Sequence, residues 1–146
     1  MFSGFSGEFE YRIDEKGRVP LPPKFRRALE DGLVLTRGPD GCIVLYTPPE
    51  WEKVANKLNS AGSLEPLKMR RLKRAVFSTA FPLNLDGQGR ITLPQPLREH
   101  AGITSDIVIS GVNNYIELWD KQRWQSEISA SLEQENQIIE SLEDRI

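Results

Sequence analysis

The chain has 146 residues, of which 19 are Lys or Arg and 21 are Asp or Glu, so its formal net charge at neutral pH is −2. An apolar fraction of 38% excludes a globally disordered chain, and a single Cys excludes an internal disulfide framework. No Cys and His pair has metal-ligand spacing, no apolar run approaches the roughly 18 residues that span a bilayer, and the N-terminus lacks a signal-peptide pattern. We therefore expect a cytoplasmic protein with no metal, cofactor or membrane segment.

In chain order, the first expected elements are two strands joined by a turn. Residues 9–13 alternate large apolar and polar side chains, as a half-buried strand does. The segment 14–17, Asp-Glu-Lys-Gly, is typical of a turn in which the carboxylate accepts backbone N–H groups and Gly supplies a positive φ. Residues 18–21 form the second strand, and Pro22 ends it and opens a short helix over 24–29.

Two more strands and two helices complete the first half of the chain. Residues 33–36 and 42–46 are expected to be strands with a turn between them. A capping box at 47–50 opens a helix with one apolar face, formed by Trp51, Val54, Ala55 and Leu58. A second amphipathic helix is expected over 64–76, with Leu64, Leu67, Leu72 and Val76 roughly on one side.

The second half repeats this order. Strands are expected at 81–85, 90–93, 106–110 and 115–119, and a short helix at 97–101 ends at Gly102. Asp120 caps a C-terminal helix that carries large apolar residues at intervals: Trp124, Ile128, Leu132, Ile138 or Ile139, and Leu142.

The two halves are copies of one module. Six residues recur 72 positions later, as Asp14/Asp86, Gly17/Gly89, Arg18/Arg90, Leu21/Leu93, Pro22/Pro94 and Arg26/Arg98. The match extends back to Phe5/Phe77 and, with one inserted residue, forward to Trp51/Trp124. A module of about fifty residues buries too little surface alone, so we expect the two copies to pair about a pseudo-twofold axis.

Charge is divided unevenly along the chain. Residues 127–146 carry six acids and one base, whereas residues 1–126 carry 18 bases and 15 acids. The bases of this larger part form two groups: Arg12, Lys16, Arg18, Lys24, Arg26 and Arg27; and Lys68, Arg70, Arg71, Lys73 and Arg74. An acidic total therefore does not exclude a local positive surface.

Each copy contains Asp-x-x-Gly-Arg, then an apolar residue, any residue and Leu-Pro, and a short helix and two strands follow. This pattern resembles the SpoVT-AbrB module of bacterial transition-state regulators and antitoxins. Two tandem copies in a chain of this length resemble the MraZ family. The resemblance implies a mainly β fold with short helices (α+β), in which both copies form one double-split, swapped-hairpin β-barrel followed by a C-terminal helix. We expect module 1 at 5–52, a helical connector at 53–76, module 2 at 77–124 and an acidic C-terminal helix at 125–146.

The resemblance also implies a function. Members of the family regulate transcription by sequence-specific binding to double-stranded DNA, typically at repeated promoter elements before the division and cell-wall gene cluster. The resemblance further implies a ring-like homo-oligomer in the cytoplasm and at the nucleoid. A ring that presents the same loop repeatedly would gain affinity for repeated short DNA sites by avidity.

The Asp-x-x-x-Arg motif of the family falls on Asp14–Arg18 and Asp86–Arg90. From spacing alone, each Asp–Arg pair could stabilise the turn or contact DNA. The two roles are compatible, because a carboxylate can orient a guanidinium toward phosphate or toward the O6/N7 edge of guanine. The expected DNA-binding residues are Arg18, Lys16, Arg90, Arg12 and Lys24, and the expected loop-positioning residues are Asp14, Gly17, Asp86 and Gly89. Gln88 replaces Lys16 in the second loop, which thereby has one fewer positive charge.

Two other functions compete with this interpretation. An antitoxin-like or scaffold module without a direct DNA role would use the acidic C-terminal helix to bind a partner. An enzyme is disfavoured, since any Ser-His-Asp set would need His100 and no P-loop motif occurs. The basic helix over 64–76 is expected either to face DNA or to pack between modules or subunits, and we favour packing. For the acidic C-terminal helix three roles stay open: a contact between subunits, a regulatory cover over another surface, or a helix exposed to solvent.

Overall fold

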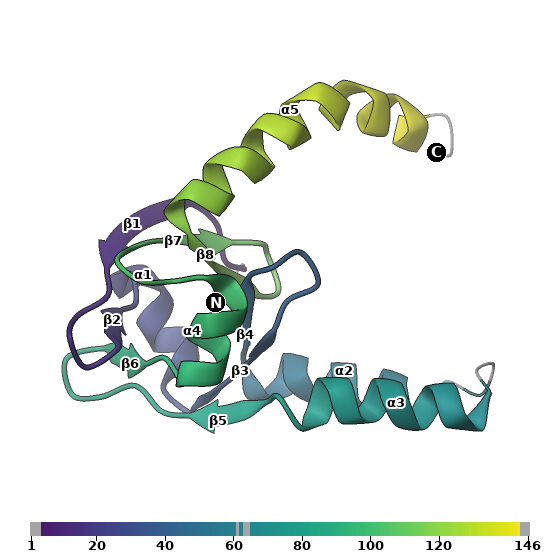
Figure 1. The fold of residues 1–146 in the computed structure, drawn as a ribbon, viewed down its shortest axis with the longest axis horizontal. Coiled ribbons are helices and arrows are strands. Elements are labelled where there is room, and N and C mark those ends of the chain that lie inside the picture. The colour runs from purple at the N-terminus through teal and green to yellow at the C-terminus, as the bar shows by residue number, and fades with distance from the viewer. Residues whose placement is uncertain (1–3, 61, 63–64, 144–146) are drawn as a thin grey trace.

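The computed structural model describes residues 4–60, 62 and 65–143 of the chain (Figure 1). The expected helix residue Leu64, and the residues Asp144 and Arg145 of the acidic end, lie outside this part. The strands are β1 Glu8–Arg12, β2 Arg18–Pro20, β3 Leu33–Arg37, β4 Ile43–Tyr46, β5 Phe81–Leu83, β6 Arg90–Thr92, β7 Asp106–Gly111 and β8 Ile116–Asp120. The helices are α1 Pro23–Arg26, the 3₁₀ turn η1 Arg27–Leu29, α2 Pro48–Ser60, α3 Pro66–Phe77, α4 Gln95–Ala101 and α5 Lys121–Glu143.

Strands of the two copies exchange partners. The larger sheet has the order β1-β7-β8-β4-β3-β5, and β2 and β6 form a separate two-stranded ribbon. Strand β1 of the first copy pairs with β7 of the second, and β5 of the second copy pairs with β3 of the first, all antiparallel. The expected mixed α+β fold with swapped hairpins and a C-terminal helix is therefore confirmed.

The strand registers locate the pseudo-twofold axis. In the β2–β6 ribbon Val19 is paired with Ile91, its own counterpart in the repeat. At the centre of the larger sheet Val44 is paired with Glu117, which is again its counterpart. Two antiparallel strands that meet at equivalent residues are related by a twofold axis through that pair, so the axis passes through both pairs.

The core belongs equally to both copies. Nine of its described buried residues come from the first copy, from Phe5 to Leu45, and nine come from the second, from Ile91 to Leu118. A smaller cluster on the outer face of the sheet combines Cys42 and Trp119 with half-buried aromatic residues. Because each copy supplies half of one core, neither copy can close around its own apolar side chains.

Local sequence explains where the helices begin and end. Helix α4 ends at Gly102, which adopts a left-handed φ of 66° as the sequence predicts. The carboxylate of Asp120 accepts the Arg123 backbone N–H at 3.2 Å and thereby caps α5. The single expected helix over 24–29 instead consists of α1 and η1, because the last turn tightens.

Helices α2, α3 and α5 extend from the β body (Figure 1). Helices α2 and α3 form a hairpin, and the rings of Trp51 and Phe77 contact edge to face at its base, 5.8 Å apart. Phe77 therefore does not share the surroundings of Phe5, its sequence match, which is buried in the core. None of the described residues of α2, α3 or α5 is buried. No helix in the described ranges is both long enough and apolar enough to cross a membrane.

Candidate nucleic-acid interface

The β1–β2 loop is organised by one carboxylate. Asp14 Oδ1 accepts the backbone N–H groups of Lys16 at 2.9 Å and Arg18 at 2.8 Å, and its Oδ2 accepts Arg18 Nε at 2.7 Å. The backbone closes the same turn, since Gly17 N–H donates to Asp14 O at 3.0 Å. Gly17 has a φ of 78°, a conformation that other residues rarely adopt. The turn and the guanidinium are thus fixed by the same side chain.

The β5–β6 loop has the same geometry. Asp86 Oδ1 accepts the N–H groups of Gln88 at 2.8 Å and Arg90 at 2.9 Å, and Oδ2 accepts Arg90 Nε at 2.8 Å. Gly89 N–H donates to Asp86 O at 3.0 Å with a φ of 74°. The structure thus brings the predicted loop-positioning residues of both copies into equivalent arrangements.

Both carboxylates remain ionised at neutral pH. The pKa of Asp14 lies below its ordinary value, chiefly because the Arg18 backbone N–H donates to the carboxylate, with further contributions from the Arg18 side chain and the Lys16 N–H. The pKa of Asp86 is lowered for the same reasons by Arg90 and Gln88. Each loop therefore holds a permanent Asp–Arg ion pair.

The ion pairs leave the outer ends of both guanidinium groups open. Arg18 and Arg90 are half-buried, with 31% and 26% of their side chains exposed. Each uses Nε for its Asp, and within the described residues neither Nη1 nor Nη2 has a hydrogen-bond partner. Each loop therefore presents a planar pair of N–H donors whose direction is set by the protein.

The two loops lie together at one end of the molecule, away from the helices that extend from it (Figure 1). Leu21 N–H donates to Gly89 O at 3.0 Å, and Leu93 N–H donates to Gly17 O at 2.8 Å. Each loop glycine is thereby tied to the strand that follows the other loop. The spacing between the two guanidinium groups is consequently set by the β2–β6 ribbon.

Arg26 and Arg98 support these loops in a way that sequence reasoning missed. The Arg98 guanidinium lies against Gly17 and that of Arg26 against Gly89, so each Arg packs on the loop of the other copy. Arg26 Nε donates to Leu21 O at 2.9 Å, whereas Arg98 Nε is buried and has no partner in the described part of the chain. Their matched positions in the repeat were the one available indication of a shared role.

The remaining predicted DNA contacts have different surroundings. Lys16 is exposed at the tip of the first loop, as is its neighbour Glu15. Arg12 donates to Ser105 at 3.2 Å and lies 3.5 Å from Asp106. Lys24 Nζ lies 5.1 Å from the ring centre of Phe9 and 5.7 Å from that of Phe25. The structure therefore places Lys16 beside Arg18, while Arg12 and Lys24 have contacts within the protein.

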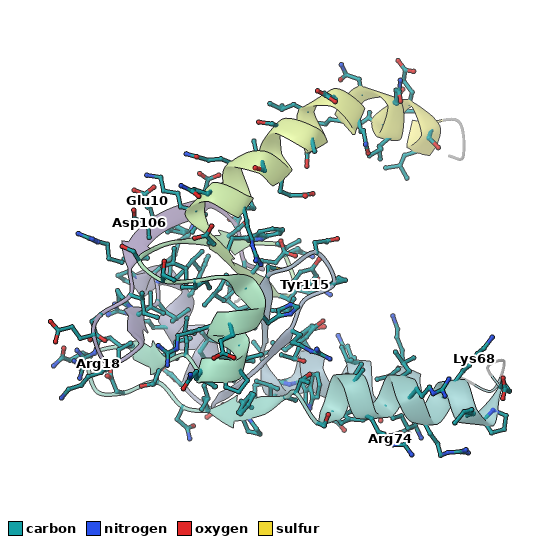
Figure 2. All side chains as sticks on the ribbon, in the orientation of Figure 1. Glu10, Arg18, Lys68, Arg74, Asp106 and Tyr115 are labelled. Atoms are coloured by element: carbon teal, nitrogen blue, oxygen red, sulfur yellow. The ribbon has the colours of Figure 1, made fainter. Side chains whose placement is uncertain are left out.

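The second group of bases occupies a different part of the molecule. Lys68 and Arg74 lie on α3, at the far end from Arg18 (Figure 2). Helix α3 contains five bases and no acid. The candidate interface at the paired loops therefore does not include this basic helix.

The fold and its two equivalent Asp–Arg loops define a class of tandem-module proteins in which both copies share one sheet and one core. The model of the family described as "MraZ protein, putative antitoxin-like" matches residues 4–74 and 76–145. This chain belongs to the MraZ family.

Similar proteins from several bacteria carry one name. A "Transcriptional regulator MraZ" of Dehalococcoides mccartyi is 55% identical over 141 residues, which cover 96% of this chain and 99% of the relative. Proteins with the same name are 46% identical in Herpetosiphon aurantiacus, over 84% of this chain and 85% of the relative, and 41% identical in Pediococcus pentosaceus, over 96% and 97%. The similarity thus covers both copies of the module.

Proposed function

We propose that this chain is a transcriptional regulator that binds double-stranded DNA through its paired loops, and that it is not an enzyme. The observation that carries the proposal is the repeated geometry of Asp14–Arg18 and Asp86–Arg90, which holds two guanidinium groups with open Nη donors at one end of the molecule. The names of the similar proteins support the same role. The proposed sites are promoter elements in repeated copies, before the division and cell-wall gene cluster.

The proposed contacts follow from donor geometry. The two Nη groups of Arg18 match the O6 and N7 acceptors of guanine or two phosphate oxygens, and the Asp14 bond limits their rotation. Lys16 at the loop tip is placed to contact phosphate. Arg90 repeats the first role, while Arg12 and Lys24 widen the positive surface after giving up part of their contacts within the protein.

We also propose that the loops differ in strength. The first loop carries Glu15 and Lys16 where the second has Gly87 and Gln88, so the formal charges of the two loops are equal. Only the first offers a flexible cation that can reach phosphate. Arg18 should accordingly contribute more to affinity than Arg90.

Oligomerisation would supply the remaining affinity. Each neutralised phosphate contributes about −0.9 to the salt slope of log K on B-DNA, so tight binding requires several contacts at once. A ring-like homo-oligomer in the cytoplasm and at the nucleoid would offer many identical loop pairs to repeated sites. We retain the division into modules 5–52 and 77–124, the connector 53–76 and the acidic helix 125–146 as part of this proposal; the matched positions of the repeat support it.

The test is binding to a promoter fragment with short direct repeats, measured by fluorescence anisotropy across about 0.05 to 0.2 M salt. We expect wild-type binding to weaken with salt and Arg18→Ala to lose it almost completely, because each lost Arg–guanine contact removes about 1–3 kcal/mol. Arg90→Ala should lose less. Size-exclusion chromatography checks that each variant keeps the oligomeric state of the wild type.

Arg27→Ala is the matched control, since Arg27 is exposed and lies outside both loops while its removal changes the charge equally. Equal affinity for scrambled DNA would refute sequence-specific binding. Unchanged binding by Arg18→Ala would refute the loop mechanism and favour an antitoxin-like or scaffold role.

A further inference from the structure

Helix α5 exposes a row of large apolar side chains. Leu132 is 65% exposed, Ile139 45% and Leu142 54%. Together with Ile128 they follow a spacing of four, seven and three residues, which places them on one side of the helix. All residues from 125 to 143 are exposed. In the part of the chain that the structure describes, this row remains largely open to solvent.

The same part of α5 is uniformly acidic. Its charged residues are all glutamates: Glu127, Glu133, Glu135, Glu140 and Glu143. Glu135 lies within the apolar row, between Leu132 and Ile139. A partner for this face must therefore offer both apolar contact and positive charge.

Helix α3 offers that combination. Its charged residues are all basic: Lys68, Arg70, Arg71, Lys73 and Arg74. Leu67 on the same helix is 37% exposed. Leu67, Arg71 and Arg74 follow a spacing of four and three residues, so they share one side of the helix.

The two helices cannot meet within one chain. Helix α5 leaves the body beside β7 and β8, whereas the α2–α3 hairpin leaves it at the opposite edge, and the two remain apart along their length (Figure 1). Figure 2 shows Lys68 and Arg74 on a helix that is far from any part of α5. Complementary faces that cannot pair internally can pair between molecules.

We propose that the α5 helix of one copy docks on the α3 face of a second copy, with its glutamates against Arg71 and Arg74 and its apolar row against Leu67. At about 1.5 Å per residue, residues 127–143 span about 25 Å and α3 spans about 18 Å, so the lengths are compatible. The inference rests on the oligomer in the proposed function and names its contact surface.

This contact is heterologous, because it joins two different surfaces of the same chain. Repetition of such a contact produces a closed ring or an open filament, according to the angle between successive copies. It uses the helices and leaves the Arg18 and Arg90 loops at the other end free for DNA. DNA is the other candidate for a basic helix, but DNA would leave the apolar row of α5 without a partner.

The experiment uses two full-length variants with reversed charge. The first, Glu135→Lys/Glu143→Lys, places two lysines beside the apolar row of α5. The second, Arg71→Glu/Arg74→Glu, places two glutamates beside Leu67 on α3. Analytical ultracentrifugation without DNA should show each variant alone dissociating at a concentration at least tenfold higher than wild type. An equimolar mixture should reassemble, since the two new lysines on α5 of the first variant meet the two new glutamates on α3 of the second, and each unaltered face also meets its complement.

Glu30→Lys/Glu99→Lys is the matched control for the first variant, because it makes the same change in charge at exposed positions on the body; it should assemble like wild type. Variants that assemble as wild type does, or a mixture that fails to reassemble, would overturn the proposed interface. An Arg71→Glu/Arg74→Glu protein that keeps its assembly but loses DNA would assign the basic helix to DNA. A monomeric wild type would refute the interface and the oligomer, while the Arg18→Ala test of DNA binding would stand separately.

Discussion

The two loop glycines should respond unequally to the same substitution. Gly17 and Gly89 have φ values of 78° and 74°, so an Ala at either position pays the same left-handed cost of about 1–2 kcal/mol. Their surroundings differ, however. A Cβ on Gly17 would lie 3.2 Å from Arg98 Cζ, whereas a Cβ on Gly89 would overlap the guanidinium of Arg26.

The difference in cost follows from how each Arg is held. Arg98 Nε has no acceptor in the described part of the chain, so this side chain can shift by the few tenths of an ångström required without losing a hydrogen bond. Arg26 is anchored by its 2.9 Å bond to Leu21 O, and moving it sacrifices a charged hydrogen bond that contributes about 1.5–3 kcal/mol. We expect Gly17→Ala to cost about 1–2 kcal/mol and Gly89→Ala about 3–5 kcal/mol.

Urea unfolding followed by Trp fluorescence measures both values. Gly87→Ala is the control within the same loop, because Gly87 has no positive φ and its Cβ would meet no atom within 4 Å. That variant should be neutral or stabilised by up to about 1 kcal/mol. Equal losses for Gly17→Ala and Gly89→Ala, or a larger loss for Gly17→Ala, would refute the anchoring role of Arg26.

Further outcomes test other parts of the structure. The lowered pKa values of Asp14 and Asp86 mean that the ionised carboxylates stabilise the fold above their unfolded pKa of about 4, and that this stability is lost as pH falls through the lower folded values. Asp14→Asn/Asp86→Asn should therefore be less stable at neutral pH and show a shallower fall in Tm between about pH 5 and pH 2; an unchanged acid profile would contradict this. Ile91→Ala, at the twofold and 2% exposed, should lose about 2–5 kcal/mol in urea unfolding, and a loss below about 1 kcal/mol would show that the ribbon is not part of the core. Burial, with a smaller effect from Glu117, raises the pKa of the Cys42 thiol. A thiol reagent should therefore modify Cys42 only as fast as the protein unfolds, and rapid modification in native buffer would contradict its burial.

Much of the fold could be predicted because its determinants are local. The Asp-x-x-Gly turn, the Pro that ends each second strand and the Gly102 helix end each depend on a few neighbouring residues, and the structure places them as expected. The repeat added the twofold relation, which the Val19–Ile91 and Val44–Glu117 pairs then located. The repeated motif could not predict which residues of the two copies come into contact across the twofold axis.

Arg26 shows why that part was missed. In sequence it is one of several bases that follow the first loop, with nothing to distinguish a structural role from a solvated one. Strand exchange places it instead on Gly89, sixty-three residues further along the chain. Phe77 shows the opposite case, since the helix-forming run before it draws it into α3 and away from the position that its match with Phe5 implies.

The location of the twofold axis has a consequence for the DNA binding that we propose. A homodimer with an exact twofold presents identical loops and selects a palindromic site. Here the two loops belong to one chain, and Glu15 and Lys16 of the first loop correspond to Gly87 and Gln88 of the second. A covalently joined pair of unequal loops distinguishes the two directions of a duplex, which suits elements repeated head to tail and disfavours inverted ones.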